Sequence, residues 1–170
     1  MIEVIPNWHP LLVHFPIALV SVSAFFHLAA RLLHNQPRFA SHCSVLAHAT
    51  LWLGALAAFP TVFFGWLAFN TVNHDAAGHA AMLLHRSWAL ATLVTLTFLA
   101  GWDAWRHKVD AVPTWSFAGA VILGWGLVAS TAWHGAELVY RHGLGVIAVP
   151  AHDDSGHHAH QHEHTHHTHL

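Results

Sequence analysis

Long apolar stretches alternate with short polar segments along this chain. Four stretches carry no formal charge or almost none, and they run over Leu11–Ala30, Val45–Val72, His79–Trp102 and Ala111–Ala136. In the third stretch the uncharged part is Ser87–Trp102, and the mostly apolar segment before it extends it. A helix that crosses the hydrocarbon core of a bilayer needs about 20 mostly apolar residues. The pattern therefore predicts four transmembrane helices.

The polar segments between these stretches are short, and they cover residues 34–41, 73–78 and 106–113. Short links join helices that are antiparallel neighbours. We therefore predict an all-α, integral membrane, up-down-up-down four-helix bundle. A soluble bundle is disfavoured, because no stretch has a polar face wide enough to meet water.

Composition narrows the class of protein further. Apolar residues make up 55% of the 170 residues and charged residues only 8%, whereas an average soluble domain has about 25% charged residues. The formal net charge of −2, with 6 Lys and Arg in total, argues against a protein that binds nucleic acid. The single cysteine, Cys43, excludes an internal disulfide.

Tryptophans and basic residues predict the orientation in the membrane. Two groups of tryptophans mark opposite helix ends, as in interfacial belts; they are Trp8, Trp66, Trp88 and Trp133, and Trp52, Trp102, Trp105 and Trp115. Four Lys and Arg residues flank the first and third links, against two on the other side. This bias predicts both termini outside, in the periplasm of a bacterial inner membrane. We expect no cleavable signal peptide, because the first stretch lacks a basic leader.

Histidine is the unusual component, with 21 residues. We divide the chain into a transmembrane domain over residues 1–150 and a disordered, histidine-rich tail over 151–170. Nine histidines fall in the tail: His152, His157, His158, His160, His162, His164, His166, His167 and His169. The tail is interpreted as a collector of Zn, Cu or Ni ions. The alternative is a solvated, low-complexity segment with incidental metal affinity.

Three histidines inside the predicted helices share one depth. At ~1.5 Å per residue, His14, His85 and His134 each lie about 7–9 Å inside the outer ends of their helices. His9 and His79 are expected above them. Histidine within a span normally faces the bundle interior or a cavity, which favours a ligand site. The alternative is that each histidine only caps a helix end or forms an interhelical hydrogen bond.

Haem b is the first cofactor that this arrangement suggests. A low-spin haem takes two axial imidazoles from different helices. We predict His14 and His85 as the axial pair, with His134 as a substitute or a hydrogen-bond partner. Arg86 and Arg141 are placed to contact the propionates.

A transition-metal ion is the alternative ligand. Three imidazoles together with Glu137, which lies on one helical face with His134, could hold Zn or Cu. An ion pair between Glu137 and Arg141 is the preferred interpretation of that carboxylate. His9, His79 and the tail histidines would add metal ligands.

A weaker inner site would combine His27 and His48, which lie at similar depths. Helical geometry partly opposes it, because His14 and His27 are separated by about 220° around one helix. The side chains of His14 and His27 therefore cannot both point toward the same interior seam of the bundle.

Three motifs resemble a known bacterial membrane family. His9–Leu19 reads HPLLVHFPIAL, and two later motifs cover Asp75–Arg86 and Glu137–Val146. They resemble the domain of unknown function 2231, a four-span unit. The resemblance implies that the positions that match the family's motifs have the role that they have in the family. These positions are His9, His14, His85, Arg141 and His142. Related domains occur joined to Rieske-type or c-type cytochrome modules, which implies a redox role by association. The tail departs from the family pattern.

The leading hypothesis is a haem b protein that transfers electrons near the periplasmic face, to or from a periplasmic redox protein or a quinone. One alternative is a Cu- or Zn-binding membrane protein in metal homeostasis; another is a non-redox accessory subunit. A homo-oligomer in the lipid bilayer is compatible with each. We expect an electron-transfer or binding protein rather than a stand-alone enzyme.

Overall fold

The structure is a computed structural model that describes residues 7–72, 74–106 and 112–145. This part of the chain is helical and contains no strand. The helices are α1 (His9–Leu12), α2 (His14–Leu32), α3 (Pro37–Thr71), α4 (Ala76–Trp105) and α5 (Trp115–His142). Only Val13 separates α1 from α2, so the two form one membrane-length unit over His9–Leu32. Four units are long and apolar enough to cross a membrane, which confirms the predicted all-α, four-span fold.

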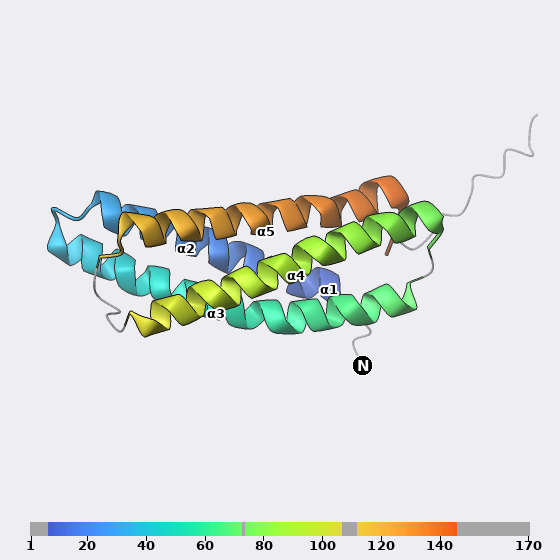
Figure 1. Ribbon diagram of the computed structural model, residues 1–170, viewed down its shortest axis with the longest axis horizontal. Helices are drawn as coiled ribbons and strands as arrows, with labels where there is room; N and C mark the ends of the chain where they lie inside the picture. The colour runs from blue at the N-terminus through green and yellow to red at the C-terminus, as the bar shows by residue number, and fades with distance from the viewer. Residues whose placement is uncertain (1–6, 73, 107–111, 146–170) are drawn as a thin grey trace, which may run out of the picture.

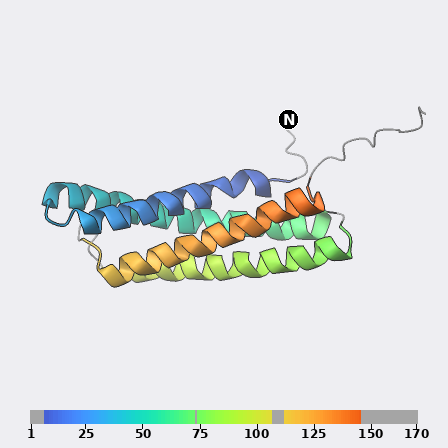
Figure 2. The same ribbon diagram turned by 90° about the horizontal axis from the view of Figure 1, so that it is seen from above.

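The four units lie antiparallel in a single elongated bundle (Figure 1, Figure 2). We call the end where α1 begins and α5 ends the terminal end, and the opposite end the distal end. The helices do not finish at the same level. The turn between α2 and α3 extends past the end of α4 at the distal end, and α3 and α4 extend past the start of α1 at the terminal end (Figure 1). Helix α2 packs mainly on α3, and α4 on α5.

Local sequence signals set several helix ends. The Asp75 carboxylate accepts a hydrogen bond from Gly78 N at 2.7 Å and caps α4, and Thr114 Oγ1 accepts one from Phe117 N at 3.3 Å and caps α5. These side chains satisfy backbone donors that a helix N-terminus leaves unpaired. Helix α5 stops at Gly143, whose φ of 60° lies in the left-handed region that favours glycine.

A proline in α2 creates a link to α3. Pro16 has no N–H, so it cannot donate to the Leu12 carbonyl one turn earlier. The Thr61 hydroxyl on α3 has one hydrogen, which it shares between Ala57 O in its own helix, at 2.8 Å, and the Leu12 carbonyl, at 3.3 Å. The acceptor that Pro16 leaves free thus holds the first span against α3.

Small and branched residues fill the interior. One cluster at mid-bundle consists of Val20, Ala55, Ala58, Leu96 and Val128. A second consists of Ala24, Leu51, Leu99, Phe117 and Val121. Glycines permit close helix contact, since a Cβ on Gly54 would lie 2.8 Å from Val20 Cγ2 and one on Gly124 would lie 2.8 Å from Leu99 Cδ1.

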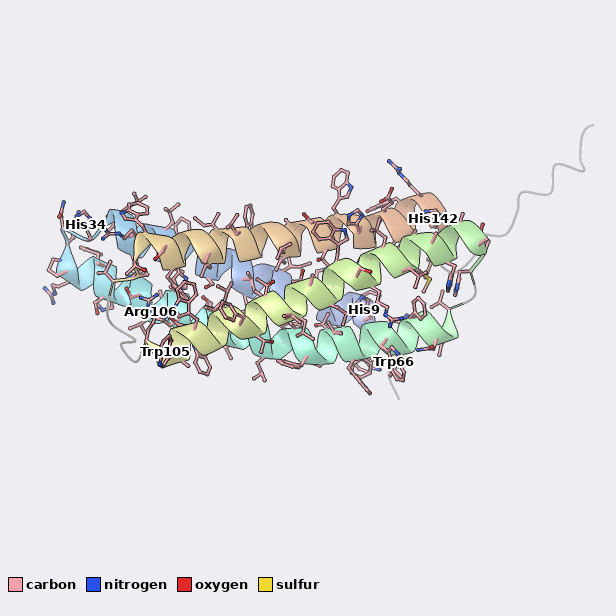
Figure 3. All side chains as sticks on the ribbon, in the orientation of Figure 1. His9, His34, Trp66, Trp105, Arg106 and His142 are labelled. Atoms are coloured by element: carbon pink, nitrogen blue, oxygen red, sulfur yellow. The ribbon has the colours of Figure 1, made fainter. Side chains whose placement is uncertain are left out.

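The outer surface of the bundle is largely apolar. Large side chains such as Val94, Phe98 and Leu123 are exposed, as a lipid-facing surface requires. Tryptophans are exposed toward both ends: Figure 3 shows Trp66 at the terminal end and Trp105 at the distal end. The surface and the four spans place this protein in a lipid bilayer.

Candidate functional site

Three ionisable side chains meet in the bundle interior toward the distal end. His27 on α2, His48 on α3 and Asp103 on α4 each offer a ligand atom, and these atoms all lie within 4.8 Å of one another. All three residues are buried, His27 completely. We call this group the distal centre. Ionisable groups inside a membrane protein are costly and mark functional sites by default.

The backbone of α2 orients the His27 ring. His27 Nδ1 lies 2.9 Å from the carbonyl oxygen of Ser23, one turn earlier. A carbonyl only accepts, so Nδ1 carries the hydrogen and donates it. The Ser23 hydroxyl donates to Ala47 O at 2.9 Å, which ties this turn to α3. The lone pair of His27 is therefore on Nε2, a buried atom without a hydrogen-bond partner among the described residues.

A carboxylate orients the His48 ring in the same way. His48 Nδ1 donates to Asp103 Oδ2 at 2.6 Å, and Trp52 Nε1 donates to the same oxygen at 3.2 Å. Within the described part of the chain, His48 Nε2 and Asp103 Oδ1 are buried and unpartnered. An imidazole whose Nδ1–H binds a carboxylate or a carbonyl, with Nε2 free, has the usual orientation of a metal ligand.

Aromatic and basic side chains line the distal centre. The Phe117 ring centre lies 5.3 Å from the His27 ring centre. The Arg106 guanidinium carbon lies 4.3 Å from the centre of the same Phe117 ring. Arg106 follows Asp103 by three residues, so a fixed positive charge lies one helical turn from the carboxylate. The apolar wall shields the centre from water.

The spacing of the two imidazoles suits a shared ion. The His27 and His48 ring centres are 5.4 Å apart and their planes are nearly perpendicular, at 87°. Two imidazoles bound at ~2.0–2.1 Å to one tetrahedral ion have ring centres roughly 5 Å apart. With Asp103 as an oxygen donor, the set is two nitrogens and one carboxylate, which suits Zn²⁺ or Cu²⁺.

A second imidazole group lies toward the terminal end. His9 on α1 and His85 on α4 have ring centres 6.3 Å apart, and we call them the terminal pair. His9 Nδ1 donates to Thr61 O at 2.9 Å. Glycines give the rings room: a Cβ on Gly65 would lie 2.9 Å from His9 Cε1, and one on Gly135 would lie 3.1 Å from His85 Cε1. Figure 3 shows His9 between the helices.

The structure thus pairs His85 with His9 and not with His14. His14 is exposed, and its Nδ1 lies 3.4 Å from Leu11 O in its own turn. Depth counting placed His9 above His85, because it took the start of every helix as one level. Helices α3 and α4 extend beyond the start of α1 (Figure 1), so His9 lies level with His85.

The other predicted site residues near the terminal end have local partners. His134 stacks on Trp88, with ring centres 5.6 Å apart, and its Nδ1 lies 3.5 Å from Glu137 Oε2. Glu137 Oε1 accepts a hydrogen bond from Arg141 at 2.8 Å, which confirms the preferred interpretation of that carboxylate.

Arg86 and His79 also lie at the terminal end. The Arg86 guanidinium lies 5.5 Å above the Phe69 ring. His79 is exposed in the first turn of α4, beside His74. The tail, with all of its predicted metal ligands, lies outside the described residues.

Sequence reasoning missed Asp103 and gave little weight to the pairing of His27 with His48. Asp103 directly follows the uncharged stretch that ends at Trp102, and nothing in the sequence indicated that it faces the bundle interior. The angular separation of His14 and His27 around the helix was the signal in the sequence that could have pointed to the distal centre. It shows that only one of them can face the interior, and the structure shows that this one is His27.

Fold and surface together define a four-span, all-helical integral membrane protein. The model of a family described as "Predicted membrane protein (DUF2231)" matches residues 6–148, and the chain belongs to this family. No curated protein and no solved structure matches the chain.

Proposed function

We propose that this protein binds a transition-metal ion of the Zn²⁺ or Cu²⁺ class inside the membrane, at the distal centre, and acts in metal homeostasis. One observation carries the proposal: three buried donor atoms without partners belong to the same three-residue cluster. They are His27 Nε2, His48 Nε2 and Asp103 Oδ1.

A purely structural role for the cluster explains less. A hydrogen-bond network that served only to join helices would be expected to pair its buried acceptors, because each buried, unsatisfied polar group costs about 1–3 kcal/mol. Here the Nδ1 side of each ring is paired and the Nε2 side is not. A bound cation would remove all three penalties at once.

The donor types select the ion. Imidazole nitrogen suits Zn, Cu and Ni, whereas Ca²⁺ and Mg²⁺ prefer oxygen and Cu(I) prefers sulfur. The distal centre offers no sulfur. In the proposed site His27 and His48 are ligands. Asp103 fixes the orientation of His48 through Oδ2 and offers Oδ1 to the ion.

Metal content and ligand spectroscopy test the proposal. The full chain is purified in detergent, and its Zn and Cu content is measured by mass spectrometry before and after chelation. Cobalt absorption then reports the geometry at the reloaded site. We expect His27→Gln and His48→Gln to remove one ion per chain. His34→Gln is the control, since His34 is exposed at the distal end (Figure 3). Equal metal content in all four proteins would contradict the proposal.

Haem b at the terminal end is the second candidate function. Two imidazoles on opposite faces of one iron, at ~2.0 Å each, have ring centres roughly 6 Å apart, and His9 and His85 are 6.3 Å apart. Such a haem would transfer electrons to or from a periplasmic redox protein or a quinone, with both termini in the periplasm. It ranks second because both rings lie against helix backbone at Gly65 and Gly135. A porphyrin would have to separate these helices.

The visible spectrum of the same sample tests this candidate. Protein from haem-replete cells should show a Soret band that sharpens on reduction with dithionite. His9→Ala or His85→Ala should abolish it, and His14→Ala should not. Loss of the band in His14→Ala and His85→Ala, but not in His9→Ala, would restore the ligand pair predicted from the sequence. A sample with neither haem nor metal would leave a non-redox accessory subunit.

A further inference from the structure

We infer that His74 and His79 form a second metal site, on the surface of the terminal end, which binds a divalent transition-metal ion such as Cu²⁺, Ni²⁺ or Zn²⁺. The site shares no residue with the distal centre or with the terminal pair. It goes beyond the proposed function and does not depend on it.

The two ring nitrogens already have the separation that chelation needs. His74 Nε2 and His79 Nδ1 are 2.9 Å apart. Two nitrogens at ~2.0–2.1 Å from one ion lie roughly 3 Å apart when they occupy neighbouring coordination positions. The rings are nearly parallel, at 11°, with centres 5.1 Å apart. In this arrangement the two nitrogens point at each other, so each ring would have to turn by roughly 45° for both to point at a common ion with neighbouring coordination positions.

Backbone contacts set the tautomer of His74. His74 Nδ1 lies 2.7 Å from Val72 O, and because a carbonyl only accepts, Nδ1 carries the hydrogen. The lone pair of His74 is therefore on Nε2, which faces His79. Without metal, His79 Nδ1 donates to that lone pair. With metal, His79 carries its hydrogen on Nε2 and Nδ1 becomes the second ligand, with no net change in protonation.

Neighbouring groups hold both rings in place. Asp75 caps α4 through Gly78 N, and its carbonyl accepts from His79 N at 2.9 Å, so His79 begins a well-defined first turn. The Phe69 ring on α3 lies 6.3 Å from the His74 ring and 5.7 Å from the His79 ring. Because these contacts already restrict both side chains, little conformational entropy would be lost on binding.

The position of the pair relates it to the histidine-rich segment of the sequence. A Cβ on Gly78 would lie 3.5 Å from His74 Cβ and 3.5 Å from Leu144 Cδ1. The chain that leaves α5 therefore passes beside the pair. In the sequence, the histidine-rich segment begins seven residues after Gly145, at His152.

Copper titration of full-length protein tests the inference. The nine tail histidines are replaced by Asn so that they cannot contribute to Cu²⁺ binding. Cu²⁺ binding at the pair is then measured by competition with a chelating dye. We expect His74→Gln and His79→Gln each to weaken binding of one ion at least tenfold. Electron paramagnetic resonance should show two coupled nitrogens falling to one. His34→Gln is the matched control and should change nothing.

Several results decide the question. Unchanged affinity and nitrogen coupling in both variants would overturn the inference. His74 precedes α4, so His74→Gln remains informative even if His79→Gln disturbs the first turn, which helical circular dichroism would show. His27→Gln should leave this site intact, and if it did not, the signal would belong to the distal centre.

Discussion

The distal centre and the terminal pair use the same side chain in two different environments. At the distal centre two imidazoles and a carboxylate are enclosed, and each ring has one nitrogen paired and one buried nitrogen free. At the terminal pair the rings instead lie against glycine backbone of α3 and α5. The distal centre thus resembles a ligand set of two imidazoles and a carboxylate, and the terminal pair resembles tight helix packing in which histidine is the bulky component. His85 Nδ1 in the terminal pair is also buried without a hydrogen-bond partner among the described residues. The carboxylate beside two imidazoles, and not a free nitrogen or the histidine count, therefore distinguishes the distal centre.

Removing the Asp103 carboxylate should give the largest difference in stability and metal content between a change at the distal centre and a change elsewhere. Asp103→Ala leaves His48 Nδ1 and Trp52 Nε1 without their shared acceptor. Leaving a buried hydrogen-bond donor unsatisfied costs about 1–3 kcal/mol, and two donors lose their acceptor here. We expect a large drop in the unfolding midpoint in detergent and loss of metal. Glu137→Ala, which removes a more exposed acid, is the control, and an equal effect of the two changes would contradict the importance of the distal centre.

Filling a glycine should disturb the terminal pair alone. A Cβ on Gly65 would lie 2.9 Å from His9 Cε1, whereas a Cβ on Gly101 would meet nothing within 4 Å. We expect Gly65→Ala to destabilise the protein by about 1–3 kcal/mol through overpacking. Gly101→Ala should stabilise it by up to ~1 kcal/mol, since glycine is unfavourable inside a helix. Thermal unfolding measures both, and metal content should stay constant. Stabilisation by Gly65→Ala would show that His9 is free to move away.

The proline-dependent link gives a smaller effect. Thr61→Val removes the donor to Leu12 O, which Pro16 leaves without its helical partner. A typical hydrogen bond contributes about 0.5–1.5 kcal/mol, and we expect a loss of that size in chemical denaturation. Thr97→Val is the matched control, because Thr97 is exposed and bonds only within its own helix. Equal losses in the two variants would mean that the link contributes nothing beyond a local bond.

The smallest effect should come from the surface ion pair. Arg141→Gln removes the 2.8 Å contact with Glu137, but the arginine side chain is 74% exposed. Exposed ion pairs contribute about 0–1 kcal/mol, so the unfolding midpoint should barely move. If haem is bound, a shift of its reduction potential in this variant would support contact between Arg141 and a propionate. An unchanged potential would count against that predicted role.

The spans could be predicted from the sequence because lipid imposes a simple rule, and four uncharged stretches obey it. The relative positions of the helices along the bundle axis could not be predicted, because they depend on how far each helix extends past its neighbours. That unknown offset grouped His14 with His85 and left His9 above them. The same offset concealed the role of Asp103, which lies in the last turn of α4, because the turn between α2 and α3 extends past the end of α4 (Figure 1). Rotational position is fixed by 3.6 residues per turn, so the opposite facing of His14 and His27 was available from the sequence.

The apolar cluster at mid-bundle also has an electrical consequence. Val20, Ala55, Ala58, Leu96 and Val128 contain no group that can exchange a proton or hold an ion. An ion that travelled between the terminal pair and the distal centre would therefore cross an insulating layer. A full crossing of the membrane changes the energy of one charge by ~2.3 kcal/mol per 100 mV. If the distal centre binds an ion of the proposed class, and the ion enters from the terminal side, the occupancy of the centre should therefore respond to membrane voltage as well as to metal concentration.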